Sequence, residues 1–334
     1  MKRALWSCLL AAAVLCPGRL PAGLEPPPVA TFSIVGIDPA NGDLGVAVAS
    51  RYFAVGAVVP WALAGVGAVA TQANVNVGYG PQAIDLLRQG MSAQQVLTKL
   101  LADDAFPGKD GRQVAIVDAK GGIAVFSGPA AQTWAGDRQG KTWTAQGNIL
   151  VGPEVVEAMG RAFETTPGEL AEKLYAALKA GDDAGGDSRG RQSASMLVVR
   201  LQGGRNLNND RYVSINVDDH PQPLPELRRL LDLNLGHLKW GAADRLLQQG
   251  DSKAALDTMR AVARYAPSLP GASGYLGLLE YLNGNRDAAL EALRAARAAD
   301  SGFEARFRAA LEARPELAPL KNDAEFLARL FSPP

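Results

Sequence analysis

Apolar residues in the first part of the chain occur in short runs that are separated by turn residues. Three such runs cover residues 33–37, 44–49 and 66–70. Short apolar runs bounded by turn residues predict buried strands. Residues 38–43, Asp-Pro-Ala-Asn-Gly-Asp, suit a hairpin between the first two strands.

The apolar spacing changes to a helical period after Pro81 and continues so to Leu101, with Ser92 as the expected N-cap of a second helix. Helices are also predicted at residues 153–163 and 167–178. Further strands are predicted at residues 113–118, 123–126, 142–146, 195–201 and 212–217. Because several links suit hairpins, we expect antiparallel sheets with helices outside them, an α+β layered sandwich rather than a doubly wound sheet.

From residue 221 the composition shifts to Ala, Leu and Arg with helical periodicity up to residue 334. Within this part an internal repeat of 34 residues relates Gly250, Ala255 and Met259 to Gly284, Ala289 and Leu293. The repeat resembles tetratricopeptide helix pairs, in which Gly makes the turn and Ala permits close helix contact. We predict a separate helical tetratricopeptide-like domain, residues 221–334, closed by helices at 303–311 and 324–331.

The first thirty residues have the pattern of an export leader followed by a spacer. A cationic start, Met1-Lys2-Arg3, precedes thirteen largely apolar residues that end at Cys16. This run is too short for a membrane span, which needs about 20 residues. We therefore expect a signal peptide at 1–22, a proline-rich spacer at 23–30 and a mature protein in the periplasm or outside the cell, without a membrane span. Both cysteines lie in the leader, so no disulfide is expected in the mature chain.

Charge and composition narrow the classes of partner. The chain has 34 basic and 34 acidic residues and no basic run, which argues against nucleic acid as a partner. His220 and His237 are the only histidines, and no carboxylate cluster has ligand spacing. We expect neither a metal site nor a cofactor.

Thr31 opens the first predicted strand directly after the spacer. If maturation cuts after Ala30, one residue would carry both a hydroxyl nucleophile and a free α-amine. The pKa of an α-amine, roughly 7.7–8.0, leaves a useful neutral fraction near pH 7, so the amine can act as the base. The alternative interpretation is that Thr31 merely begins an edge strand, as threonine often does.

Several segments in the same order resemble an uncharacterised prokaryotic family that is assigned to the N-terminal nucleophile hydrolase superfamily. The similar segments are residues 31–35, 45–50, 53–61, 67–73, 146–150 and 185–194. The resemblance covers residues 31 to about 220. It implies a four-layer αββα sandwich, and active members elsewhere in the superfamily cleave amide bonds with an N-terminal Thr, Ser or Cys.

Ser50 and Arg51, at the end of the second predicted strand, resemble the strand-end Ser-Arg of proteasome-type subunits. Ala49 replaces the aspartate that precedes that pair, and no lysine occurs between Lys2 and Lys99 to match the strand lysine of those subunits. A mechanism here would use the α-amine as its only base, tuned by Arg51. An ordinary surface ion pair is the alternative for Arg51.

Amide side chains end two of the predicted strands. Gln72 and Asn148 are candidate donors to an oxyanion, and Asn74 is a candidate substrate contact. Stabilisation of turns by Asn and Gln is the alternative.

Charged residues and glycines crowd the loop before the strand at 195–201. Asp187, Arg189, Arg191 and Ser193 are candidate substrate-binding residues, and a solvated loop with local salt bridges is the alternative.

The leading hypothesis is an exported amidohydrolase in which Thr31 attacks a small amide or a peptide. Its helical repeats would bind a protein partner or assemble copies of the enzyme. The rival hypothesis is a non-catalytic binding or scaffold protein that acts through its cleft and its helical repeats.

Overall fold

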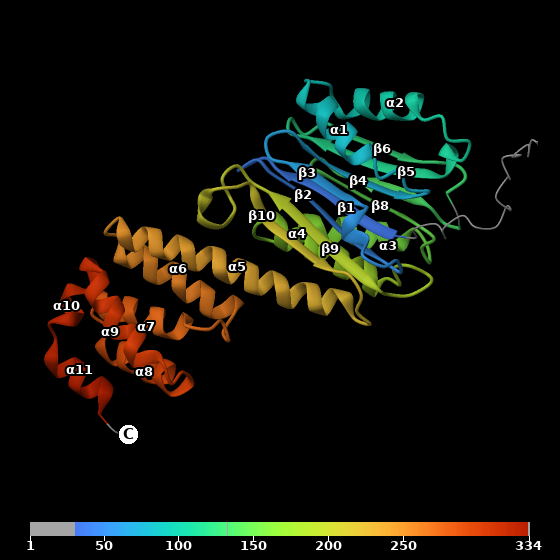
Figure 1. Cartoon of the computed structure of the whole chain (residues 1–334). Coiled ribbons are helices and arrows are strands. Elements are labelled where there is room, and N and C mark those ends of the chain that lie inside the picture. The colour runs from blue at the N-terminus through green and yellow to red at the C-terminus, as the bar shows by residue number, and fades with distance from the viewer. Residues whose placement is uncertain (1–30, 132, 333–334) are drawn as a thin grey trace, which may run out of the picture.

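The computed structural model describes residues 31–131 and 133–332. The predicted signal peptide at 1–22 and the spacer at 23–30 lie outside the described residues. The mixed α+β class is confirmed, with two antiparallel sheets and a helical C-terminal region (Figure 1). Within the described part of the chain, no helix is long and apolar enough to span a membrane.

The larger sheet has six antiparallel strands in the order β10-β9-β2-β1-β8-β7. They are β1 (Thr31–Asp38), β2 (Asp43–Ser50), β7 (Gly136–Gln139), β8 (Trp143–Asn148), β9 (Ser193–Val199) and β10 (Arg211–Val217). The smaller sheet has the order β3-β4-β5-β6. Its strands are β3 (Pro60–Leu63), β4 (Gly67–Ala73), β5 (Arg112–Asp118) and β6 (Ile123–Ser127).

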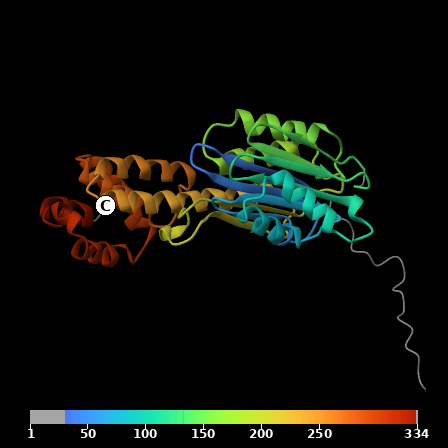
Figure 2. The same cartoon turned by 90° about the horizontal axis from the view of Figure 1, so that it is seen from above.

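Each sheet carries two helices on its outer face, so the elements form four layers (Figures 1 and 2). The smaller sheet is covered by α1 (Tyr79–Arg88) and α2 (Ala93–Asp103), and the larger sheet by α3 (Glu154–Thr165) and α4 (Leu170–Asp183). The predicted cap of α2 is confirmed, because Ser92 Oγ accepts from Gln95 N at 3.3 Å and Gln95 Oε1 accepts from Ser92 N at 2.9 Å.

The space between the sheets is apolar over most of its length. Inward-facing Val, Ile, Leu and Ala residues fill it, among them Val35, Val46, Val48, Ala70 and Val117. These residues alternate along their strands with residues that face the helices, as a two-sided buried sheet requires. The polar residues of the candidate site interrupt this layer at one end.

Helix α5 (Pro223–Gln248) belongs to two hydrophobic cores. Leu224, Leu227, Leu231 and Leu235 pack in the core of the larger sheet with α3 and α4, whereas Leu247 packs in the helical core. The region continues with α6 (Ser252–Tyr265), α7 (Ala272–Leu282), α8 (Arg286–Ala299), α9 (Phe303–Ala313), α10 (Ala318–Lys321) and α11 (Ala324–Phe331). Short 3-10 turns lie at η1 (Val55–Ala57), η2 (Lys109–Gly111), η3 (Arg205–Leu207) and η4 (Pro315–Leu317).

The internal repeat falls on equivalent positions of two helix pairs, α5–α6 and α7–α8. Gly250 and Gly284 have φ of 86° and 83°, a left-handed turn that glycine adopts without strain. Ala255 and Ala289 are fully buried where the helices meet. The comparison with tetratricopeptide repeats itself stays a prediction.

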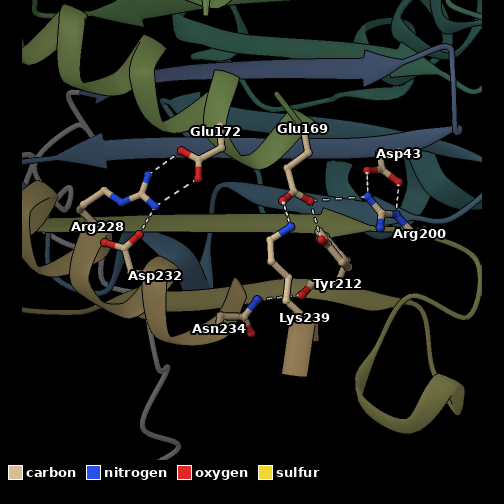
Figure 3. A network of polar contacts seen from close by, with 9 residues as sticks. All are labelled: Asp43, Glu169, Glu172, Arg200, Tyr212, Arg228, Asp232, Asn234 and Lys239. Carbon is tan, nitrogen blue, oxygen red and sulfur yellow. Dashed lines mark hydrogen bonds and ion pairs between the residues drawn. The ribbon is translucent and has the colours of Figure 1, made fainter. Parts of the chain in front are cut away.

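Polar contacts fasten α5 to the sandwich (Figure 3). Glu169, just before α4, accepts from the hydroxyl of Tyr212 on β10 and pairs with Lys239 on α5 at 3.5 Å. Arg228 on α5 donates to Glu172 of α4 at 2.6 Å. The helical region therefore continues directly from a helix that is bound to the sandwich along its first half.

Candidate functional site

Four of the predicted site residues lie in one row across the larger sheet. Thr31 is paired in register with Ser50 on β2 and with Asn148 on β8, and Ser50 is paired with Ser193 on β9. Residues paired directly across antiparallel strands share a face, so all four point into the space between the sheets. Each of them is at most 2% exposed. We call Ser193, Ser50, Thr31 and Asn148 the polar row.

Hydroxyl contacts position three side chains of the polar row. Thr31 Oγ1 donates to Ser50 Oγ at 3.1 Å. Ser193 Oγ donates to the carbonyl of Tyr52 at 2.5 Å and accepts from Val55 N at 3.3 Å, which ties η1 to β9. The polar row contains no ionisable side chain. Any proton transfer within it therefore needs a group other than these side chains.

A chain of buried hydrogen bonds links the two sheets directly behind the polar row. Thr144 Oγ1 donates to Gln146 Oε1 at 3.2 Å, and Gln146 Nε2 donates to Ser33 Oγ at 2.6 Å. Ser33 Oγ donates to Gln72 Oε1 on the smaller sheet at 2.7 Å, and Gln72 Nε2 donates to Gln113 Oε1 at 2.8 Å. All five residues are fully buried. Every donor in this series points the same way, and such series strengthen cooperatively.

Gln113 fixes the orientation of the amides around it. Its Nε2 donates to the carbonyls of Gly147 at 2.9 Å and Gly136 at 3.3 Å. A carbonyl can only accept, so this end of the Gln113 amide must be the nitrogen. Gln113 Oε1 is then the acceptor, and it receives Asn148 Nδ2 at 3.0 Å in addition to Gln72.

The amide orientation that Gln113 fixes leaves one oxygen of the polar row without a hydrogen-bond donor in the described part of the chain. Asn148 Oδ1 is buried and has no hydrogen-bond partner among the described residues. An unsatisfied buried acceptor costs roughly 1–3 kcal/mol. The group that would satisfy this oxygen must be a donor, and it must reach the polar row beside Thr31.

Left-handed backbone marks the same end of both sheets. Ala73 and Ile149, which follow Gln72 and Asn148, have φ of 64° and 53°. A β-branched residue such as Ile149 is rare in this region, and strain of this kind gathers at functional sites.

The loop before β9, which carries Asp187 and Arg189, is bound to the residue that follows β2 and does not point into the polar row. Asp187 is buried and accepts from Arg51 N at 2.8 Å and from Arg189 N at 2.9 Å. Arg189 Nη2 also pairs with Asp187 at 3.0 Å. Asp187 thereby holds the loop against the residue that follows Ser50, which agrees with the alternative of local salt bridges.

Two other predicted binding residues do not join the polar row in the hydrogen bonds they make. Arg191 Nε pairs with Asp182 of α4 at 2.6 Å, and its side chain is half-exposed. Asn74 Nδ2 donates to the carbonyl of Gly108 at 3.3 Å, beyond the end of β4.

Sequence reasoning missed Ser33, Gln113 and Gln146. Two of them carried a signal: Ser33 lies two residues after Thr31 and Gln146 two before Asn148, so each shares a face with its predicted neighbour. Among residues 31–131 and 133–332, no group of three His, Cys, Asp or Glu side chains is placed to hold a metal.

Comparisons with known proteins agree on one family. Residues 31–227 match a family of unknown function, DUF1028. The crystal structure of protein SPO2555 from Silicibacter pomeroyi, of the same family, is similar at 30% sequence identity and a TM-score of 0.55; the match covers 60% of this chain and 84% of that one. No curated protein matches the chain. These matches cover the sandwich that carries the polar row, and the chain belongs to the DUF1028 family, whose function is unknown.

Proposed function

We propose that the chain is the precursor of an exported amide hydrolase of the N-terminal nucleophile type, with Thr31 as its first residue after maturation. The observation that carries the proposal is the buried acceptor Asn148 Oδ1, which lacks a donor beside Thr31. Cleavage before Thr31 would create such a donor, because an α-ammonium has more hydrogens than the peptide N–H that it replaces.

The alternation of N–H directions along β1 supports a contact between the new amine of Thr31 and Asn148. Ile37 N donates to the carbonyl of Thr142 on β8 at 2.9 Å. In an antiparallel ladder every second residue directs its N–H to the same neighbouring strand. Thr31 lies six residues before Ile37, so its nitrogen is directed toward β8, the strand of Asn148. Asn148 would accept one N–H of the new amine and hold it beside Oγ1 of Thr31.

The proposed reaction is acyl transfer to a hydroxyl. The α-amine of Thr31 takes the hydroxyl proton while Oγ1 bonds to the amide carbonyl carbon. The amine then gives the proton to the leaving nitrogen as the C–N bond breaks, and water hydrolyses the ester that remains on Oγ1. The amide nitrogens of Gln72 and Asn148 already donate to Gln113, so their use as oxyanion donors would require that these bonds open.

The rival proposal is a binding protein with the same sandwich and tetratricopeptide-like repeats. Thr31 is fully buried and donates to Ser50, and this burial favours the rival because a substrate carbonyl must reach Oγ1. In that case Thr31 and its hydrogen bonds would serve to hold β1 and β2 together.

The first test is the mature N-terminus of the protein recovered from its native export compartment. Intact mass and N-terminal sequencing should give a chain that starts at Thr31. A stable chain that starts at Gly23 would place the amine on the wrong residue and favour the binding protein.

A β-lactone probe then tests the nucleophile. The probe should add its full mass to the peptide that contains Thr31, with Thr31→Ser labelled and Thr31→Ala not labelled. The matched control is Thr98→Ala, an exposed threonine on α2. Equal labelling of Thr31→Ala and wild type would contradict catalysis by Thr31.

A further inference from the structure

A cavity lies at the opposite end of the larger sheet from the polar row. Strand β9 begins at Ser193, in the polar row, and ends at Val199, roughly 20 Å away at 3.3 Å per residue. The loop that follows β9 and the middle of α5 line an open cavity of about 810 Å³. A cavity of this size suits a small organic ligand. We call it the loop–helix cavity.

Positive charge without an acidic partner lines the loop–helix cavity. Arg200 is neutralised by Asp43 at 2.5 Å, and Lys239 by Glu169 (Figure 3). Arg205 on η3 and Arg245 on α5 also line the cavity. Neither of these two makes an ion pair or a side-chain hydrogen bond within the described residues.

No acidic side chain lines the cavity in the described part of the chain. His237 also lines it, and burial followed by the nearby charge of Arg205 lowers the pKa of His237. The histidine is therefore mostly neutral at pH 7, and the two arginines supply the unbalanced charge. Guanidinium groups present their N–H donors in a planar fork that matches carboxylates and other oxyanions.

The loop also offers apolar surface to a ligand. Leu201 and Leu207 line the cavity while 70% and 46% exposed. Gln202, Asn206 and Leu207 have φ of 54°, 59° and 57°. Asparagine tolerates this region, but left-handed backbone at Gln202 and Leu207 is costly, and such strain recurs in segments that clamp ligands.

We propose that the loop–helix cavity binds a small organic anion, with its oxyanion head on Arg205 and Arg245 and its apolar body against Leu201 and Leu207. This site is separate from the polar row. The inference therefore stands whether or not Thr31 is a nucleophile.

The probe for this site is 8-anilinonaphthalene-1-sulfonate, which joins a sulfonate to an apolar ring system and fluoresces when bound. The full-length protein should bind it saturably. The double variant Arg205→Gln/Arg245→Gln should raise its Kd about tenfold, since half-exposed ion pairs each contribute modestly. Arg138→Gln, an exposed arginine on β7, is the matched control and should leave Kd unchanged.

A competition experiment separates the anion from the apolar body. 4-Phenylbutanoate should displace the probe, whereas its neutral amide should compete at least tenfold less well. Thermal melting of each variant establishes that it is folded. Absence of saturable binding, an unchanged Kd in the double variant, an equal loss in Arg138→Gln, or equal competition by the amide would each overturn the proposal.

Discussion

Gln113 joins the two sheets at the candidate site, and its replacement by Met should lower the stability of the sandwich. Methionine fills a similar volume without polar atoms. The change would leave Gln72 Nε2 and Asn148 Nδ2 without the acceptor that they share, and Gln72 is fully buried while Asn148 is 1% exposed. At roughly 1–3 kcal/mol for each of these two unsatisfied groups, we expect a loss of about 2–6 kcal/mol in the free energy of unfolding.

Urea unfolding followed by circular dichroism measures this loss. In thermal unfolding of a unit of 150–250 residues, the same loss should lower Tm by roughly 4–24 °C. The matched control is Gln94→Met on α2, where the glutamine is exposed and donates to Thr98 at a long 3.4 Å. If both variants lose the same small amount of stability, the energetic role assigned to Gln113 is wrong.

A second substitution at the same position tests the orientation of the amide. Gln113→Glu would place a carboxylate oxygen against the carbonyls of Gly147 and Gly136, where the native nitrogen donates. Burial and these carbonyls should raise the pKa of the introduced carboxyl above its unfolded value of about 4.3. A raised pKa in the folded state means that stability is gained as pH falls through that pKa. The deficit relative to wild type should therefore shrink on acidification, and a deficit that grows would refute the orientation.

Two further predictions concern ion pairs. Arg200→Gln should cost about 2–4 kcal/mol in urea unfolding because the carboxylate of Asp43 is buried, and the added change Asp43→Asn should recover part of this loss; additive losses would argue against the pair. Burial alone would raise the pKa of Asp104, but hydrogen bonds from Arg112 and Tyr79 outweigh burial and lower it to about 2. The stability that Asp104 contributes should thus be complete above pH 4 and be lost between about pH 4 and 2, so Asp104→Asn should flatten the pH dependence of unfolding in that window.

The buried strands and the helices could be predicted because the spacing of their apolar residues is visible within a short stretch of sequence. The runs at 33–37 and 44–49 lie within β1 and β2, the run at 66–70 overlaps β4 in all but its first residue, and Ser92 caps α2 as expected. Strands β3 and β7 were missed. Each has four residues at a sheet edge, half-buried in β3 and mostly exposed in β7, so neither shows a run long enough to detect.

The sequence indicates the four residues of the polar row, but not how they connect to one another or to the residues behind them. Thr31, Ser50 and Asn148 lie at ends of predicted strands and Ser193 in a predicted loop, and only the register shows that the four share one row. Gln113 gave no local signal, because the amides and the carbonyl it contacts lie 34, 35 and 41 residues away. Hydrogen bonds across two sheets depend on how the sheets face each other, which a single sequence does not encode locally.

The composition shift at residue 221 marks the point where strands give way to helices. Within the described residues, no flexible linker separates the two parts there, because α5 joins them. α5 begins at Pro223, packs four leucines in the first core and reaches the second core without a break, over roughly 39 Å at 1.5 Å per residue. Because α5 is continuous, a displacement of the helical repeats would also move its first half. That movement would strain the contacts of α5 with α4 and β10, among them Arg228–Glu172 and Asn234–Tyr212. The loop–helix cavity lies along the same helix. A ligand in that cavity would therefore contact a helix that itself packs on the larger sheet, with no linker between the two in the described chain.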